Sequence, residues 1–380
     1  MKVIIIVIFA AIVLFSCNRK KEINPLTVKL VEVEKVKFQV SDDVIPLAIN
    51  IEYLKGYIIY YLYILDGDNH LLVYNLDTRE CIKKLDLEVE GNNGVGKATC
   101  FKVLSPESVL ITSKFHQKLF LVNADGIVID RYPFECDSLQ TSYCNSGIDH
   151  PIVVNNDVFI LPQNFVGNWN NLSTEYYNAY TTTICLNRSS GEITKSGMGF
   201  PFPQDEFTSP GFSYCYLNGQ FIYSFDVVDS IYFLNSNGMV RSRYVGSPNI
   251  KSLPKKKILK TNSIESIVKD WVKSSHFAQI QSDTTQNIIY RFYRIGLENL
   301  TSDQNIMEIH RYPPRFGIQI LDENGATIGD QVFPENQFFY HNSFVAKGIL
   351  YISNNHPLGD DFDVDFFTFT AFKSEFNNED

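Results

Sequence analysis

The segment Phe120-Leu121-Val122-Asn123-Ala124-Asp125-Gly126 joins an apolar run to an Asn and a glycine-containing turn. The same form recurs in four other segments of the 380-residue chain, at 72–77, 184–191, 232–238 and 318–325. Four of the five segments have Gly where a tight hairpin needs a positive φ angle. The pattern therefore predicts a series of similar β-hairpins.

The spacing of these hairpins predicts the fold. The Asn or Asp residues that precede the turns are separated by 48, 64, 48 and 87 residues, and they are Asn75, Asn123, Asn187, Asn235 and Asp322. A further strand-like run, 366–372, ends about 49 residues beyond the last of them. A period near 48 is typical of a four-stranded propeller blade whose outer two strands form the repeated hairpin. The sequence thus predicts an all-β, six-bladed propeller over residues 26–380.

Two other features complete this prediction. The alternating run 27–40 is expected to pair with the C-terminal strands and close the ring. The longer spacings predict insertions at 162–180 and 251–300. The second insertion is expected to contain a helix near 263–276, with Asn262 as its N-cap and Glu265 at the third helical position. Its apolar stripe is expected to pack on the propeller, and comprises Ile264, Ile267, Val268 and Trp271. An open pair of β-sandwiches or two stacked domains are the alternatives.

Composition supports a folded, acidic β-protein. The chain is 44% hydrophobic and 20% charged, with 29 Phe and 21 Tyr, which favours strands and excludes disorder over most of the length. Its formal net charge is -10, from 43 acidic and 33 basic residues. No basic stripe is present to meet phosphates, so the sequence argues against a nucleic-acid partner.

The N-terminus predicts export and a lipid anchor. Residues 1–16 combine a basic start with an apolar run too short to span a bilayer in the ordinary way, as signal peptides do. Cys17 follows Leu14-Phe15-Ser16, which resembles the lipobox of bacterial lipoproteins, and 17–25 would form the lipidated tether. Asn18 favours the outer membrane by resemblance to other lipoproteins. An ordinary signal peptide with a chance cysteine, or an uncleaved anchor, are the alternatives.

One linking motif points to a family. The motif Glu90-Gly91-Asn92-Asn93-Gly94-Val95-Gly96, together with the period and the lipobox, resembles bacterial lipoproteins with six-bladed, TolB-like propellers. In that family a Glu-Gly-Pro-Asn-Gly type loop links an early pair of blades, and Asn92 stands where Pro is frequent. A later segment, 276–292, is also similar, with an acidic residue before Tyr-Arg-aromatic. The resemblance implies the fold and the anchor but assigns no chemistry.

A cationic and aromatic segment is the predicted ligand site. Strand alternation would place Arg291 and Tyr293 opposite their neighbours in the run 290–294. Arginine with aromatic rings is a usual recognition set for carboxylates or sugars. The candidate ligand-binding residues are Tyr290, Arg291, Arg294, Arg311 and Arg315. The alternative is that an arginine here stacks across an aromatic blade face.

Catalytic and metal signals are weak. The sequence has no nucleophile elbow and no zinc-protease motif, so no catalytic residue is predicted. Four histidines in loop-like stretches are expected either to line one mouth of the channel or to lie on the surface: His150, His310, His341 and His356. No cofactor is predicted; the alternative is calcium held by Asp361, Asp363 and Asp365 on one face of a strand.

These observations predict a membrane-anchored envelope lipoprotein whose propeller binds an unidentified protein or carbohydrate ligand. The first alternative is a hydrolase or lyase that acts on a carbohydrate or small ester at the channel mouth. The second is a structural subunit of an envelope assembly. Because fold does not determine function, the side chains at the channel must distinguish them, and the sequence favours a protein without catalytic activity.

Overall fold

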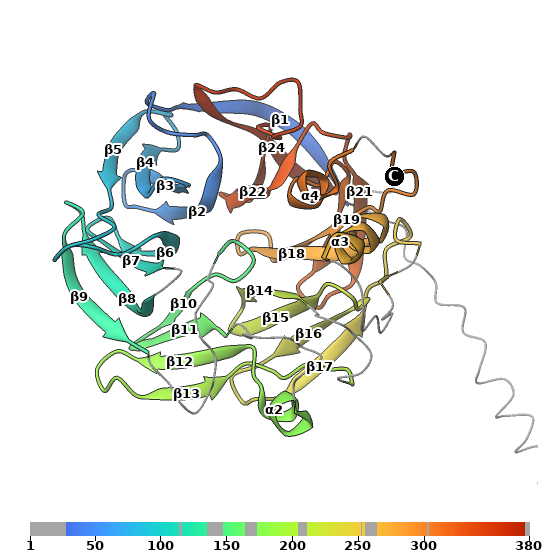
Figure 1. The fold of residues 1–380 in the computed structure, drawn as a ribbon, viewed down its shortest axis with the longest axis horizontal. Helices are drawn as coiled ribbons and strands as arrows, with labels where there is room; N and C mark the ends of the chain where they lie inside the picture. The colour runs from blue at the N-terminus through green and yellow to red at the C-terminus, as the bar shows by residue number, and fades with distance from the viewer. Residues whose placement is uncertain are drawn as a thin grey trace, which may run out of the picture.

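Six antiparallel sheets of four strands each surround a central axis in the computed structural model (Figure 1). The structure describes residues 28–113, 116–134, 147–163, 173–203, 211–251, 253–254, 264–301 and 304–376. The six-bladed propeller predicted from the repeat is therefore confirmed, whereas the signal peptide, Cys17 and the tether lie outside the described residues.

The first three blades follow one another along the chain. Blade 1 contains β2 (Ala48–Lys55), β3 (Tyr60–Asp66), β4 (His70–Asn75) and β5 (Cys81–Asp86). Blade 2 contains β6 (Ala98–Ser105), β7 (Ser108–Ser113), β8 (His116–Asn123) and β9 (Val128–Pro133). Blade 3 contains β10 (Val153–Asn155), β11 (Val158–Pro162), β12 (Thr183–Asn187) and β13 (Ile193–Ser196).

The last three blades end with the sheet that uses both ends of the chain. Blade 4 contains β14 (Phe212–Leu217), β15 (Gln220–Phe225), β16 (Ser230–Leu234) and β17 (Val240–Tyr244). Blade 5 contains β18 (His276–Asp283), β19 (Ile288–Arg294), β20 (Phe316–Asp322) and β21 (Thr327–Val332). Blade 6 contains β22 (Phe339–Ala346), β23 (Ile349–Ser353), β24 (Phe366–Phe376) and β1 (Val28–Gln39).

The repeated Asn or Asp has a structural reason. Asn123 Oδ1 accepts hydrogen bonds from the backbone N–H groups of Asp125 and Ile127, both at 2.9 Å. All five repeat residues accept two such bonds from the turn that follows the third strand of their blade. The side chain thereby fixes the turn into the fourth strand, as short polar side chains do. Gly126 completes this turn with a φ of 80°.

The N-terminal strand closes the ring. β1 pairs with β24 from Val28 opposite Phe376 to Gln39 opposite Phe366. Phe38 is fully buried, and its ring lies 5.2 Å from that of Tyr74 in blade 1 and 6.1 Å from that of Phe369 in β24. The predicted closure by 27–40 is confirmed, and β1 also joins the last blade to the first.

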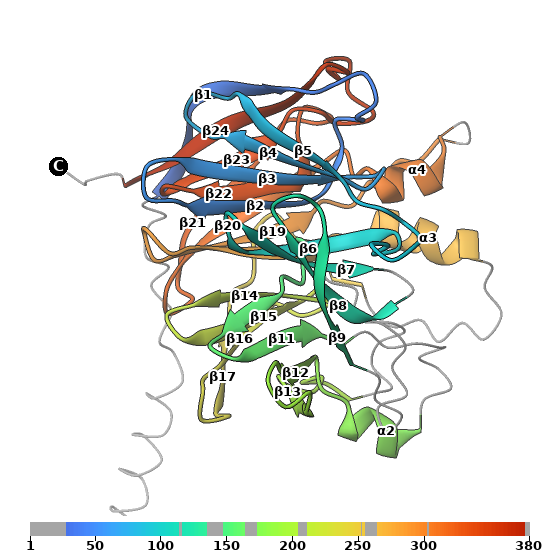
Figure 2. The same ribbon diagram turned by 90° about the vertical axis from the view of Figure 1, so that its left-hand side faces the viewer.

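The two ends of the ring differ. One end, which we call the helix face, carries α2 (Thr174–Ala179), α3 (Ile264–Lys273) and α4 (Ile306–Arg311), as Figure 2 shows. The second strand of each blade joins the third at this end, and successive blades are linked there. The opposite end, the hairpin face, carries the turns between first and second strands and between third and fourth strands, such as 56–59 and 124–127.

The structure corrects the extent of the second insertion. Residues 276–294, which were assigned to the insertion 251–300, are β18 and β19, the inner two strands of blade 5. The additional residues of this repeat lie before β18 and between β19 and β20, where α3 and α4 occur. The repeated Asn or Asp marks only the turn after a third strand, so the spacing of 87 residues does not locate these additional residues.

The helix predicted near 263–276 is present but ends earlier. α3 ends at Lys273, because the chain must become extended at His276 to begin β18. Of the predicted stripe, Val268 is 8% exposed and Trp271 packs against a buried cluster of blades 3 and 4, whereas Ile267 is 40% exposed and does not pack on the propeller. The predicted cap, Asn262, lies outside the described residues.

We expect Phe38→Ala to lower the free energy of unfolding by about 3–5 kcal/mol, because it leaves a cavity where blades 6 and 1 meet. Val33→Ala, on the same strand at a side chain 48% exposed, is the matched control and should change stability by less than about 0.5 kcal/mol. Urea unfolding followed by circular dichroism measures both. Equal effects of the two substitutions would show that β1 is not a core strand.

Candidate functional site

Arg294 is the centre of a polar cluster on the helix face. At the end of β19, its Nε donates to Tyr340 Oη at 2.7 Å, and one terminal nitrogen donates to the carbonyl oxygen of His310 at 2.9 Å. The other terminal nitrogen lies 3.2 Å from His341 Nε2. Three of the five guanidinium N–H groups are thus used, and the other two have no partner within the described residues. Arg294 therefore joins blades 5 and 6, and two of its N–H groups are left without an acceptor among the described residues.

The protonation of His341 follows from this contact. A guanidinium only donates hydrogen bonds, so Nε2 of His341 accepts and the imidazole proton lies on Nδ1. Burial, and then the charge of Arg294, lower the pKa of His341 to about 3. His341 is neutral at physiological pH, and Arg294 retains its charge beside it.

Two carboxyl groups lie within the electrostatic influence of Arg294. Burial raises the pKa of Asp149 to about 6 and that of Asp226 to about 8, and the charge of Arg294 partly opposes both shifts. Asp226 Oδ2 accepts a hydrogen bond from Gly211 N at 2.8 Å. The Oδ1 atoms of both residues are inaccessible to solvent and have no hydrogen-bond partner in the described part of the chain. Asp226 is therefore mostly protonated at neutral pH, whereas Asp149 is mostly ionised.

Other histidines surround the same cluster in neutral form. Burial lowers the pKa of His276 well below its usual value, and the charge of Arg294 adds to this shift. Burial likewise lowers the pKa of His310 and brings that of His150 to about 4. His356 is fully buried, and its Nε2 lies 3.2 Å from the carbonyl oxygen of Pro313. All four histidines singled out from the sequence lie on the helix face.

A cavity of about 500 Å³ lies in the central channel and is walled by the innermost strands of all six blades. Glu52 and Lys102 form an ion pair in its wall, and Glu52 Oε2 also accepts a hydrogen bond from Val103 N at 2.8 Å. Burial raises the pKa of Glu52. Gly147 and Ile148 line the same cavity, so the segment that carries Asp149 also bounds the channel.

Two of the predicted ligand residues are structural. Arg291 is fully buried and donates to Ser224 Oγ at 2.8 Å and to backbone carbonyl groups of blade 4 and the segments beside it. Its guanidinium lies 3.2 Å from the ring centroid of Phe277. Tyr290 is also fully buried, with its hydroxyl 2.9 Å from Ser374 Oγ. Arg291 therefore fills the alternative role, an arginine packed against an aromatic blade face.

The remaining predicted residues do not join the Arg294 cluster through any hydrogen bond of the described chain. Arg311, at the end of α4, and Arg315, just before β20, are exposed. Asp361, Asp363 and Asp365 precede β24 instead of lying on a strand, and Asp363 pairs with Lys37 at 2.7 Å. Within the described residues no group of three His, Cys, Asp or Glu side chains is placed to hold a metal ion.

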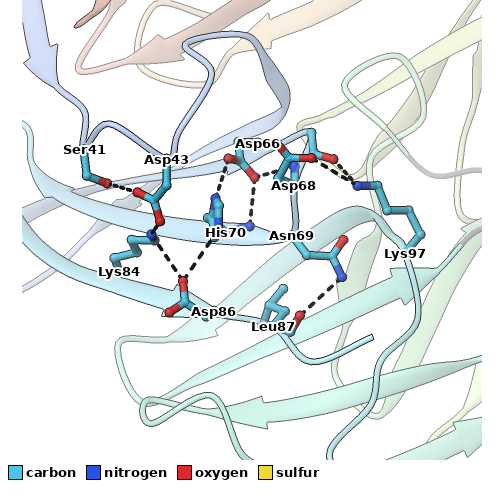
Figure 3. Close-up of polar contacts among 11 residues, drawn as sticks. Ser41, Asp43, Asp66, Asp68, Asn69, His70, Lys84, Asp86, Leu87 and Lys97 are labelled. Carbon is cyan, nitrogen blue, oxygen red and sulfur yellow. Dashed lines mark hydrogen bonds and ion pairs between the residues drawn. The ribbon is translucent and has the colours of Figure 1, made fainter. Parts of the chain in front are cut away.

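A second polar cluster on the helix face is internally paired (Figure 3). Asp66 Oδ2 lies 2.7 Å from His70 Nδ1, and Asp66 Oδ1 accepts from the backbone N–H groups of Asp68 and His70. Asn69 donates to Gly96 O at 2.7 Å and accepts from Ala98 N at 3.0 Å. The loop 90–96, noted as a family motif, is thus hydrogen-bonded to blade 1 and links it to blade 2.

Comparison with known proteins identifies the family. The family model described as a domain of unknown function, DUF4221, matches residues 27–324. The chain belongs to the DUF4221 family. A crystal structure of a DUF4221 member from Bacteroides vulgatus superposes with a TM-score of 0.82 at 20% identity, covering 92% of this chain and 99% of that one. The suspected propeller family is thereby confirmed.

A more distant structure has the same fold. An inferred exported protein from Bacteroides fragilis gives a TM-score of 0.55 at 10% identity, covering 94% of this chain and 98% of that one. No functionally curated protein matches the sequence. None of the described helices has the length and apolar character needed to cross a membrane.

Sequence reasoning identified Arg294 and the histidines around it but missed three other members of the cluster. Asp149, Asp226 and Tyr340 each lie beside or within a strand of a different blade, with no spacing that relates them to Arg294. The three residues share one feature: each lies on the helix face, where the first strand of a blade begins or its second strand ends. That signal becomes readable only after the blades have been assigned.

The raised pKa of Asp226 predicts a pH dependence of stability. Between about pH 4 and pH 8 the folded chain keeps this proton and the unfolded chain loses it, so the stability contribution falls as pH rises. We expect Asp226→Asn to remove a slope of at most about 1.4 kcal/mol per pH unit. Urea unfolding across this range measures the slope, and Asp125→Asn, at an exposed turn, is the control. Parallel curves for Asp226→Asn and the parent protein would contradict the assignment.

Proposed function

We propose that the protein is an envelope propeller that binds a small carboxylate-bearing ligand, with acidic sugars as the favoured class, at the Arg294 cluster. The observation that carries this proposal is the incomplete hydrogen bonding of Arg294. Its guanidinium is held at three positions and has two uncommitted N–H groups in the described chain. An arginine fixed in this way is well suited to a planar carboxylate.

The surrounding groups support recognition of hydroxyl groups as well. Tyr340 Oη accepts from Arg294 and is fully buried, so this tyrosine holds the guanidinium in position for a ligand. His341 is partly exposed and carries its proton on Nδ1, which supplies a neutral donor for a ligand hydroxyl group. A neutral donor beside one cation matches a ligand that carries both a carboxylate and hydroxyl groups.

Asp149 makes this recognition depend on pH. Its pKa of about 6 leaves it mostly ionised at pH 7, where it competes with a ligand carboxylate for Arg294. Protonation of Asp149 below pH 6 removes the competing charge. Binding of an anionic ligand should therefore strengthen as the pH falls from 7 to 5.

A hydrolase or lyase at the Arg294 cluster is the second candidate. It is favoured by the difference between the pKa values of Asp149 and Asp226, about 6 and about 8, which suits one group to act as a base and the other as an acid. The structural-subunit alternative receives less support, because α3 buries Val268 and Val272 within its own chain.

The finer assignments of location are part of this proposal. The lipobox-like sequence before Cys17 supports a lipid anchor, and Asn18 supports the outer membrane. The resemblance to TolB-like lipoproteins and the structural likeness to an inferred exported protein support the same location. Acylation of Cys17 with more than one chain would give stable anchoring.

We expect Arg294→Gln to weaken binding of glucuronate and galacturonate by roughly 10–100-fold, the loss typical of a charged hydrogen bond. Arg315→Gln, at an exposed arginine, is the matched control and should bind as the parent protein does. Isothermal titration calorimetry at pH 5 and pH 7 measures affinity, with glucose and galactose as uncharged counterparts.

Failure of the parent protein to bind either uronate, or equal affinity of Arg294→Gln, would refute the carboxylate proposal. The enzyme candidate is separated by incubation with nitrophenyl glucuronide and nitrophenyl acetate. Product release that disappears in Asp226→Asn would favour the hydrolase. A thermal unfolding midpoint close to that of the parent shows that each variant is folded.

We expect Cys17→Ala to abolish incorporation of labelled fatty acid and to release the protein from the membrane fraction of cells, because the thiol that carries the acyl chains is removed. Ser16→Ala, which keeps a small residue before the cysteine, is the control and should remain labelled. Retention of the label in Cys17→Ala would refute the lipid anchor.

A further inference from the structure

The hairpin between β2 and β3 exposes two large apolar side chains. Tyr57 and Ile58 occupy its tip with relative exposures of 103% and 83%, the highest of the large hydrophobic residues in the described chain. Burial in the fold therefore does not explain either side chain. A tyrosine beside an aliphatic residue is a pair suited to a boundary between water and an apolar phase.

The equivalent hairpins in the other five blades are different. Their tips are polar or consist of ordinary turn residues, namely Pro106–Glu107, Asn156–Asp157, Asn218–Gly219, Thr284–Asn287 and Lys347–Gly348. Turn positions favour Gly, Asn, Asp, Pro and Ser for conformational reasons. The tip 57–58 departs from this rule in blade 1, and such local departures are expected at functional sites.

The tip is held in place by its base. Gly56 N donates to Ile59 O at 3.0 Å, which closes the turn around Tyr57 and Ile58. A side chain at Gly56 would lie 2.4 Å from the Ile59 carbonyl oxygen, so the close turn requires glycine. At the base, the Tyr60 ring stacks on Tyr53 and receives the Lys347 ammonium group 3.7 Å from its centroid. The hairpin therefore presents its apolar tip on a fixed support.

The tip lies on the face where the chain enters the propeller. Val28, the first described residue, pairs with Phe376, and this end of β24 lies on the hairpin face, opposite the three helices (Figure 2). Cys17 and Val28 are separated by ten residues, 18–27, which span at most roughly 35 Å when extended. A lipid anchor at Cys17 would thus keep the hairpin face near the membrane.

Neighbouring blades add apolar groups to this face. Ile127, in the β8–β9 turn of blade 2, is 46% exposed, and Phe376, in blade 6, is 56% exposed. Lys55 is exposed at the base of the hairpin, where it can meet an anionic headgroup. Blades 6, 1 and 2 therefore share exposed apolar side chains beside the entry of the chain, on turns that also carry the exposed acidic residues Asp77, Glu107 and Asp125.

We propose that Tyr57 and Ile58 contact the lipid bilayer and orient the propeller with its hairpin face towards the membrane. The Arg294 cluster on the opposite face is then directed away from the bilayer, towards ligands in the surrounding compartment. This inference rests on the lipid anchor proposed above, which holds the tip close enough to the bilayer for two side chains to contact it. It does not depend on the identity of the ligand.

The test places an environment-sensitive fluorescent amino acid at Ile58 by codon suppression in the full lipidated chain. The protein is reconstituted in vesicles of phosphatidylethanolamine and phosphatidylglycerol, with and without a lipid that carries a quencher near its headgroup. We expect at least roughly twofold stronger quenching at position 58 than at Glu107, the tip of the corresponding blade 2 hairpin, because an interfacial side chain lies among the headgroups. Tyr57→Ser should reduce the quenching at position 58.

The outcomes separate this inference from the anchor proposal. A Cys17→Ala chain that incorporates labelled fatty acid as the parent chain does refutes the lipid anchor. A chain that binds through Cys17 but shows no more quenching at position 58 than at Glu107 refutes only the hairpin contact. Stronger quenching of a fluorophore at Met307, which is 52% exposed on the helix face, would establish the reverse orientation and overturn the inference.

Discussion

The pairing of β1 with β24 is the constraint on which the rest of the structure depends. Blade 6 takes three strands from the end of the chain and one from its beginning, so the sheet is complete only when both ends of the domain have met. Closure places blade 6 between blades 5 and 1 and buries Phe38 against both the last and first sheets. The candidate site depends on this closure, because Tyr340 and His341 of blade 6 hold Arg294 of blade 5.

Blade number and the closing strand could be predicted because their signals are local. The repeated Asn or Asp accepts hydrogen bonds from backbone N–H groups within four residues of itself. The same turn therefore requires the same residue type at the same position wherever it recurs. The positions of the extra residues of blade 5 could not be predicted, because the repeated Asn or Asp lies at the end of the third strand. It carries no information about the length of the segments that precede the first and third strands.

The site was only partly predictable because its contacts are not local. Arg294 was identified from its own strand, but its partners Tyr340 and His341 lie 46 and 47 residues away. Asp149 and Asp226 come from other blades, and their raised pKa values arise from burial that exists only in the closed ring. A sequence pattern can show which residue types are present, but it does not show which of them are buried together.

Arg291 and Arg294 show why strand position decides the role of an arginine. The two residues lie three positions apart on β19 and therefore point to opposite sides of the blade. Arg291 is surrounded by the carbonyl groups of blade 4, which satisfy a charge that burial would otherwise make very unfavourable. Arg294 stands at the end of the strand, where the described residues supply three acceptors. The same residue type is thus structural in one case and available for a ligand in the other.

The two faces of the ring have different chemistry for a structural reason. Turns on the hairpin face must connect adjacent strands within a few residues, and this leaves little freedom in length or in residue type. Links on the helix face join separate blades or carry whole helices, and all seven histidines of the chain lie at this end. Variable links on a rigid ring are where binding groups are most readily assembled. The apolar pair Tyr57 and Ile58 is therefore exceptional among the tips of the hairpin face. The titratable groups around Arg294, in contrast, lie on the helix face, where the connecting segments can vary in length and residue type.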